Sequence, residues 1–290
     1  MSTEKYRVFL KTVDSGSFSA VAQELGYTPS GIVHMMNSLE EQFGFPLLIR
    51  SHKGVRLTEN GQRVLPIVRN IVRWEEYLHQ TCSDICGVVA GDISIGSYFS
   101  IASAWLPGTI RSFQQDHPNV RIHVQEGVHQ ELDTLITEHR VDFCIYSYPP
   151  ANGMQWLPLK RDPMVAVLPA DHPMASAESF PIGAFEEEPF IMPAGGYDYD
   201  IMTVFGKHKI EPRVSYSTGE DHAAISMVES GLGITLLNEL ATSKYISETV
   251  RLPLEPQEYA AMGVAAPSIR KLSPAARLFV RYLEKYVGSL

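Results

Sequence analysis

Apolar positions recur at helical spacing in two short segments near the N-terminus. The first stripe ends before Gly26 and consists of Phe18, Val21, Ala22 and Leu25. Thr28 and Pro29 then start a second helix, because a threonine side chain can accept a hydrogen bond from a free amide and proline fits the first helical position. Its buried stripe is Ile32, Met35, Met36 and Leu39. Two helices joined by a short turn with a glycine predict a helix-turn-helix, although an ordinary helical pair has the same pattern.

A β-hairpin is predicted directly after the second helix. Residues 47–50 and 55–57 can pair as short strands around the turn at 51–54. Three cations lie at or near the tip of this hairpin, and cations at such a tip suit DNA phosphates: Arg50, Lys53 and Arg56.

A long helix is predicted from Thr58, its N-cap, to about residue 86. Its apolar residues form a narrow seam, and Pro66 is expected to bend the start of the helix. The seam is too long for a small N-terminal domain to cover, which favours pairing with a second copy over packing on the same domain. Its members are Val64, Ile67, Val68, Ile71, Trp74, Leu78, Thr81 and Ile85.

Beyond residue 90 the pattern changes to alternating strands and helices. The first unit has predicted strands at 92–96, 120–125 and 141–146, and predicted helices at 101–116 and 129–139. A second unit begins near residue 156, with strands at 164–168, 190–192, 214–216 and 234–237 and helices after Gly196 and at 223–230. The strand 262–266 and the helix 273–286 return to the first unit. We expect an α/β domain with a mainly parallel sheet and a ligand cleft between two lobes.

Net charge changes this picture only after it is divided along the chain. The whole chain carries −9, but residues 1–88 hold nine Lys and Arg against nine Asp and Glu, so the acidic excess lies in the remainder. Within residues 50–73 six cations face only Glu59. Charge therefore permits DNA binding.

Cysteine usage and hydropathy indicate the compartment. Three cysteines, Cys82, Cys86 and Cys144, do not make a disulfide framework, and no segment reads as an export signal or a membrane span. We expect a cytoplasmic protein. His79 lies on one helix face with Cys82 and Cys86, which suggests a metal or thiol sensor. Only three ligands are visible and cysteine is often a small apolar residue, so we predict no metal site and no cofactor.

The residues resemble the LysR-type transcriptional regulators. The resemblance rests on many matches in one order and spacing, among them Phe9, Val13, Gly16-Ser17-Phe18, Ala22, Leu25, Thr28-Pro29-Ser30, Leu39-Glu40, Gly44, Leu47, Arg50, Lys53, Val55, Leu57-Thr58 and Gly61. It continues through Leu106-Pro107, Asp171-His172-Pro173, residues 228–237 and residues 273–277.

The resemblance implies three parts. A winged helix-turn-helix domain would occupy residues 1–58 and a linker or dimerisation helix residues 59–88. An α/β effector domain of two lobes, like a periplasmic binding protein, would follow at 91–290. Its first lobe would take in about 91–161 and 266–290, and its second about 162–265.

The DNA contacts are predicted from the helix-turn-helix and the wing. They are Ser17, Thr28, Pro29, Ser30, Val33, His34, Asn37, Arg50, Lys53 and Arg56. The family usually has a serine and then a basic or polar residue where this chain has Val33 and His34. Val33 cannot hydrogen-bond a base edge but could pack against a thymine methyl group. Direct readout would therefore depend on the other polar side chains, namely Thr28, Ser30, His34 and Asn37.

The effector contacts are predicted from loops at strand ends. They are Ser97, Tyr98, Phe99, Ser100, His129, Tyr146, Ser147, Gly195, Gly196, Tyr197, Thr218, Gly219 and Glu220. In the family, the residue that corresponds to Ser100 commonly touches the effector. These loops contain acidic residues and no Arg, whereas a carboxylate ligand would call for a cation. We therefore expect a neutral or cationic small molecule with an aromatic part.

The preferred function is a ligand-responsive transcription regulator. It would bind double-stranded DNA as a homodimer that pairs to a tetramer. A constitutive regulator without an effector is one alternative, and an enzyme built on the α/β lobes or a plain solute-binding protein are others. The enzyme is disfavoured because the chain has no dinucleotide fingerprint, phosphate loop or nucleophile elbow.

Overall fold

The computed structural model describes residues 3–52 and 54–290, so the predicted wing residue Lys53 lies outside the described residues. The chain forms two compact units. One consists of residues up to Val88 together with 138–140, and the other of residues 89–137 and 141–290. Each unit is described by itself.

The N-terminal unit is the predicted winged helix-turn-helix. Its elements are α1 (Thr3–Ser15), α2 (Phe18–Leu25), α3 (Pro29–Phe43), β1 (Leu48–Ser51), β2 (Gly54–Leu57) and α4 (Glu59–Ile85). Side chains cap the helices as the sequence predicts: Thr28 accepts a hydrogen bond from the Gly31 amide and Thr58 from the Gly61 amide. The chain leaves α2 at Gly26, whose φ of 71° suits glycine.

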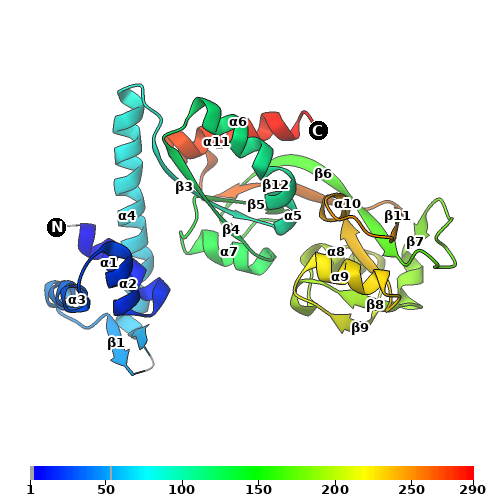
Figure 1. The fold of residues 1–290 in the computed structure, drawn as a ribbon, viewed down its shortest axis with the longest axis horizontal. Coiled ribbons are helices and arrows are strands. Elements are labelled where there is room, and N and C mark those ends of the chain that lie inside the picture. The colour runs from blue at the N-terminus through cyan, green and yellow to red at the C-terminus, as the bar shows by residue number, and fades with distance from the viewer. Residues whose placement is uncertain (1–2, 53) are drawn as a thin grey trace. The chain divides into compact units, whose positions relative to one another are not determined.

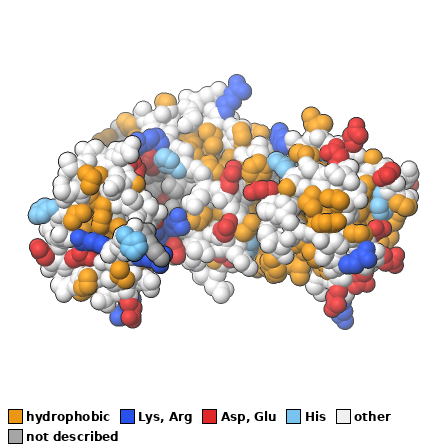
Figure 2. Space-filling model, turned by 60° about the horizontal axis from the view of Figure 1, so that its bottom comes forward, with side chains coloured by type: hydrophobic (Ala, Val, Ile, Leu, Met, Phe, Trp, Pro, Cys, Tyr) orange, Lys and Arg blue, Asp and Glu red, His pale blue; other side chains and the backbone are white. Residues whose placement is uncertain are grey.

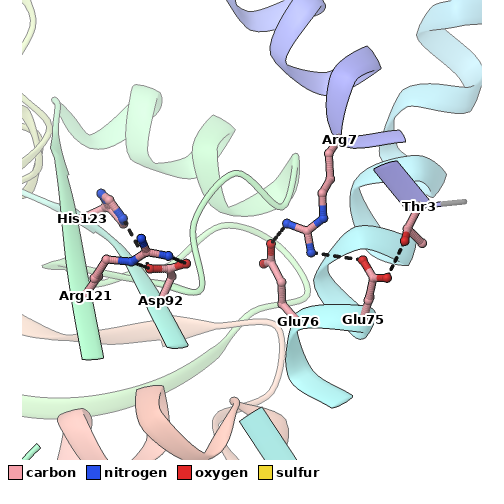
Figure 3. Close-up of polar contacts among 7 residues, drawn as sticks. All are labelled: Thr3, Arg7, Glu75, Glu76, Asp92, Arg121 and His123. Carbon is pink, nitrogen blue, oxygen red and sulfur yellow. Dashed lines mark hydrogen bonds and ion pairs between the residues drawn. The ribbon is translucent and has the colours of Figure 1, made fainter. Parts of the chain in front are cut away.

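Apolar burial and one ionic cluster hold α1 against α4. The core of this unit includes Phe9, Ile32, Leu39, Leu47 and Val68, which are at most 1 % exposed. Figure 3 shows the ionic cluster at its edge. The Arg7 guanidinium of α1 lies 2.8 Å from the Glu76 carboxylate and 3.1 Å from the Glu75 carboxylate, both on α4. The Thr3 hydroxyl also donates to Glu75.

The predicted seam of α4 divides into two stripes. Val68 of the seam is buried in the core of the unit together with Val72, which the predicted seam did not include, whereas five other members are 40–81 % exposed: Ile67, Ile71, Trp74, Leu78 and Ile85. Pro66 is the eighth residue of α4, and the helix continues through it. Figure 1 shows α4 extending well beyond the three-helix domain. We call these five exposed side chains the α4 stripe.

The α/β unit has two lobes. The first contains β3 (Gly91–Ser97), α5 (Phe99–Ala104), α6 (Leu106–Asp116), β4 (Val120–Glu126), α7 (His129–Thr137), β5 (Phe143–Ser147), β12 (Tyr259–Ala266) and α11 (Pro274–Val287). The second contains β7 (Phe180–Pro181), β8 (Pro189–Met192), α8 (Tyr199–His208), β9 (Arg213–Ser217), α9 (Asp221–Glu229), β10 (Thr235–Asn238), α10 (Glu239–Ser243) and β11 (Val250–Glu255). Both lobes are visible in Figure 1.

Three predictions for this unit are corrected. The expected helix at 101–116 is two helices that meet at Trp105, because Pro107 has no amide to continue the hydrogen-bond ladder. The helix expected to reach residue 139 ends at Thr137, and His139 has a φ of 56°. The sheet is mixed rather than mainly parallel, since β12 is antiparallel to both β5 and β6.

One strand, β6 (Gln155–Leu168), belongs to both lobes. Its first part, residues 155–163, pairs with β12 of the first lobe. Its last part, residues 164–168, lies between β10 and β11 of the second. At the edge of the first-lobe sheet, a bidentate contact of 2.6 and 3.0 Å joins Arg121 of β4 to Asp92 of β3 (Figure 3).

The Gly61→Ala substitution is expected to destabilise the N-terminal unit by about 1–3 kcal/mol. A Cβ at this position would lie 2.2 Å from the Leu47 carbonyl oxygen, so the first turn of α4 would have to move away from the wing. Thermal unfolding followed by circular dichroism measures the loss.

Gly206→Ala is the matched control, because it is another helical glycine with nothing within 4 Å of the added methyl group. It should leave the melting temperature unchanged or raise it. Equal melting temperatures for the Gly61→Ala variant and the wild type would show that α4 does not pack this closely on the wing.

Candidate functional site

The start of α3 presents polar side chains to solvent. Thr28, Pro29, Ser30 and His34 are exposed, while Val33 is half-buried. The hydroxyl groups of Thr28 and Ser30 lie 3.1 Å apart, and Thr28 also caps the helix. A helix that begins with short exposed polar side chains can approach base edges in a major groove. Ser17 is half-buried and is the N-cap of α2.

Arg50 connects the wing to α3. Its guanidinium donates to the side-chain oxygen of Asn37 at 2.6 Å and to the carboxylate of Glu40 at 2.9 Å. The same Glu40 side chain accepts from the amides of Leu47 and Leu48 at 2.7 and 2.9 Å. Glu40 therefore fixes the wing relative to α3. It matched the family pattern in the sequence, but nothing in its spacing indicated this role.

The cations of the wing are thus not equivalent. Part of the Arg50 charge is neutralised by Glu40, and its guanidinium also lies 5.4 Å from the Phe18 ring centroid. Arg56 is exposed on β2, and no ion pair involving it occurs among the described residues. Arg56 is consequently the described wing cation most available to a DNA phosphate.

A cavity of about 660 Å³ lies in the α/β unit. Eight of the predicted effector contacts line it: Tyr98, Phe99, Ser100, His129, Gly195, Tyr197, Gly219 and Glu220. The other five do not: Ser97, Tyr146, Ser147, Gly196 and Thr218. The cavity is formed by strand ends and helix starts of both lobes, which is where the sequence predicted it.

The predicted residues outside the lining have other partners. The Tyr146 hydroxyl donates to the Asp133 carboxylate at 2.7 Å and its ring is buried. The Ser97 hydroxyl donates to the Tyr98 carbonyl oxygen. Ser147 supports the cavity from behind, because its hydroxyl lies 2.9 Å from the Tyr98 hydroxyl.

Two ring contacts join the lobes beside this cavity. His129 of α7 stacks on Tyr199 of α8 with 4.1 Å between ring centroids and 17° between ring planes. Phe99 of α5 meets His222 of α9 edge to face at 4.9 Å. The His129 ring is also 3.0 Å from the Tyr98 hydroxyl. Burial lowers the pKa of His129, so the ring is neutral at pH 7.

Carboxylates of the second lobe dominate the charge of the cavity. Asp198 accepts from the Ile201 amide and caps α8, while Asp200 and Asp221 lie in the first turns of α8 and α9. Burial raises the pKa of Asp200 and of Asp221 to about 7, and it also raises that of Asp198. Acidic side chains are visible near the junction of the two lobes in Figure 2. The acidic residues that the sequence placed in the cleft loops include Asp198, Asp200 and Asp221, although the predicted set of effector contacts did not include these three.

The proposed cysteine sensor gains no support from geometry. Cys82 and Cys86 are exposed, and Cys144 is buried with its pKa raised by burial. Residues 3–52 and 54–290 contain no group of three His, Cys, Asp or Glu side chains arranged to hold a metal ion. Within the same ranges no helix has the length and apolar character needed to cross a bilayer.

Two family models match the chain and together span most of it. The model described as "LysR substrate binding domain" matches residues 87–288. The model described as "Bacterial regulatory helix-turn-helix protein, lysR family" matches residues 3–62.

Individual relatives are similar along the whole chain. An uncharacterised HTH-type transcriptional regulator of Bacillus subtilis (strain 168), YvbU, is 28 % identical over 292 residues, which is all of both chains. The crystal structure of HinK, a LysR family regulator from Pseudomonas aeruginosa, is 26 % identical with a TM-score of 0.62 and full coverage of both chains. Full-length CbnR in complex with its target DNA shares the fold at 16 % identity, with a TM-score of 0.67 over 99 % of this chain and all of that one.

The Arg56→Ala substitution is expected to weaken binding to all DNA sequences by a similar factor. Loss of one phosphate contact should make the plot of log affinity against log salt concentration less steep by about one unit. Fluorescence anisotropy with labelled duplexes at several salt concentrations measures both effects.

Ser30→Ala provides the complementary control. It should leave the salt dependence unchanged but reduce the preference for the operator over a half-site mutant by about tenfold. If Arg56→Ala keeps the salt slope of the wild type, Arg56 does not contact a phosphate.

Proposed function

The chain belongs to the LysR family of transcriptional regulators, and from this premise we propose that it binds its operator as a homodimer controlled by a small molecule in the α/β cavity. The exposed polar start of α3 is the observation that carries the DNA part of this proposal. Thr28 and Ser30 lie at its tip, and Glu40 and Arg50 fix the wing beside it. Sequence readout by Thr28, Ser30, His34 and Asn37 stays a prediction, as does phosphate binding by the wing.

The α4 stripe supports the dimer. Ile67, Ile71, Trp74 and Leu78 follow one another at spacings of three and four residues and are 40–60 % exposed. This continuous apolar face lies on a helix that extends beyond α1–α3. Such a face is suited to packing against the same helix of a second copy. A dimer would place two α3 helices on one DNA molecule, so binding of the second half-site becomes effectively intramolecular. Pairing of dimers to a tetramer stays a prediction.

Control by a ligand requires different affinities for two states of the protein. The cavity is lined by residues of both lobes, so a bound molecule would favour one degree of lobe closure. If closure changes the affinity for the operator, then operator DNA must change the affinity for the ligand by the same factor. A constitutive regulator would lack this reciprocity.

The lining favours a neutral or cationic ligand with an aromatic part. Tyr98, Phe99, Tyr197 and Tyr199 offer ring faces, and the described lining contains no Lys or Arg that would pair with a carboxylate. An enzyme on these lobes is not favoured by any observation in the cavity.

The proposal is tested by selecting genomic fragments that the purified protein binds at low ionic strength. We expect enrichment of a small number of sites with two related half-sites, and competition between them and random DNA gives the specificity ratio. A monomeric protein that binds every fragment equally would contradict it.

The Leu78→Glu substitution is expected to raise the dimer dissociation constant at least about 100-fold, because each dimer would bury two carboxylates at an apolar contact. Sedimentation velocity measures the dissociation constant, and operator affinity should fall in parallel.

Ile246→Glu is the control for a general effect of replacing an exposed apolar residue by a charge. Ile246 is fully exposed and lies outside the α4 stripe, so its replacement should leave the dimer intact. Identical sedimentation of Leu78→Glu and wild type would exclude the α4 stripe as the dimer contact.

A further inference from the structure

The charges of the cavity define a narrower ligand class than its rings do. We propose that the cavity binds an organic cation whose protonated amine is held by Asp200 and Asp221; this rests on the proposed function, in which the cavity holds the effector. The amine would lie at the starts of α8 and α9, and the apolar part of the ligand would lie against the aromatic rings.

The lining of the cavity has an excess of negative charge. Both lobes contribute carboxylates, namely Glu126 and Glu131 from the first and Asp198, Asp200, Glu220 and Asp221 from the second. The only basic side chain among the described lining residues is His129, which is neutral at pH 7 because burial lowers its pKa. A ligand that carries a positive charge would restore the balance, whereas an anion would be repelled.

The helix starts that face the cavity are occupied by carboxylates of the chain itself. The free amides at a helix N-terminus normally attract an anion. Here the chain itself supplies the anions: Asp198 accepts from the Ile201 amide at 2.9 Å, and Glu131 accepts from the Val128 amide at 3.1 Å. A carboxylate ligand would therefore find these positions occupied.

Two carboxylates of the lining, Asp200 and Asp221, can still accept hydrogen bonds from a ligand. The Asp200 carboxylate is close enough to Asp198 and Asp221 for their charges to act on it. No hydrogen bond or ion pair of the Asp221 side chain occurs among the residues that the structure describes, and its neighbours Asp198 and Glu220 are both acidic. An ammonium group with three donors suits this pair.

The rings distinguish an organic cation from a metal ion. Tyr98, Phe99, Tyr197 and Tyr199 line the same cavity, and a cation above an aromatic face is stabilised by the ring quadrupole. A metal ion would require a compact cage of oxygen ligands, and no group of three suitable side chains is arranged as one in the described ranges. A volume of about 660 Å³ also exceeds what a metal ion needs.

Because Asp200 and Asp221 titrate, the affinity for the ligand should depend on pH. Burial raises the pKa of Asp200 and Asp221 to about 7, so each is largely protonated at pH 6 and ionised at pH 8. The other titratable groups around them are Asp198 and Glu220 beside the pair, Asp162, whose charge also acts on Asp200, and, elsewhere in the lining, Tyr98, Glu126, His129, Glu131, Tyr197 and Tyr199. An ammonium group binds the ionised form, so affinity is lost as pH falls; one group with a pKa near 7 gives a loss of about tenfold from pH 8 to pH 6.

The experiment is isothermal titration calorimetry of the full chain with four amines, one neutral probe and one anionic probe. The amines are 2-phenylethylamine, tyramine, putrescine and agmatine; the neutral and anionic counterparts are 2-phenylethanol and phenylacetate. We expect at least one amine to bind at pH 8, with at least tenfold lower affinity at pH 6 and with release of protons at pH 7. The neutral and anionic probes should bind more weakly than the amine of the same skeleton.

Charge-neutral variants locate the amine. Asp200→Asn and Asp221→Asn should each weaken amine binding at least about tenfold, since the ion pair is replaced by a neutral contact. Asp171→Asn is the control, because Asp171 is exposed and lies outside the lining. Thermal unfolding of each variant shows that it is folded. Unchanged amine affinity in both cavity variants, tighter binding of phenylacetate than of any amine, or no binding of any amine would overturn the inference.

The same preparations separate this inference from the proposed function. Operator binding that responds to an anionic or neutral compound would leave the regulator intact and refute the organic cation. Failure to bind any genomic fragment selectively would refute the regulator, whatever the amines do.

Discussion

The two lobes of the α/β unit are constrained by one shared strand. Residues 155–163 of β6 pair with β12 in the first lobe, and residues 164–168 pair with β10 and β11 in the second. Because the backbone hydrogen bonds of both sheets meet in this strand, the cavity walls cannot separate without bending it. A difference in closure between two states would therefore bend β6 where its pairing passes from the first lobe to the second, between residues 163 and 164.

The cavity carries an electrostatic cost that the fold does not offset. The Asp198 carboxylate at the start of α8 accepts from a backbone amide, which stabilises this helix locally. Burial and mutual repulsion then raise the pKa values of Asp200 and Asp221 to about 7. Acidic residues at the helix starts thus serve both helix capping and the proposed ligand binding. A positively charged ligand would relieve the electrostatic cost of burying these carboxylates, and this relief would contribute to its affinity.

Sequence reasoning identified the elements whose signals are local. The caps at Thr28 and Thr58, the glycine at position 26 and the alternation of strands and helices in the α/β unit depend on residues within a few positions of one another. It failed where contacts between residues far apart in the sequence determine burial or the lining of the cavity. The predicted α4 seam combined Val68, which is buried in the core of its unit, with residues that are exposed. The predicted effector contacts omitted Asp200 and Asp221, because only the folded lobes bring them into the same cavity lining as Tyr98. The split at Trp105 could have been read from Pro107.

The three tryptophans of the chain lie in three different environments. Trp74 is 57 % exposed on the α4 stripe, Trp105 is fully buried in the first lobe, and Trp156, on the shared strand β6, contacts the rings of Tyr146 and Tyr148. Their fluorescence emission should differ in wavelength, because a solvent-exposed indole emits at longer wavelength than a buried one. Intrinsic tryptophan fluorescence could then follow three processes separately, without any attached dye: the proposed pairing of subunits, the unfolding of the α/β unit and the proposed movement of its lobes.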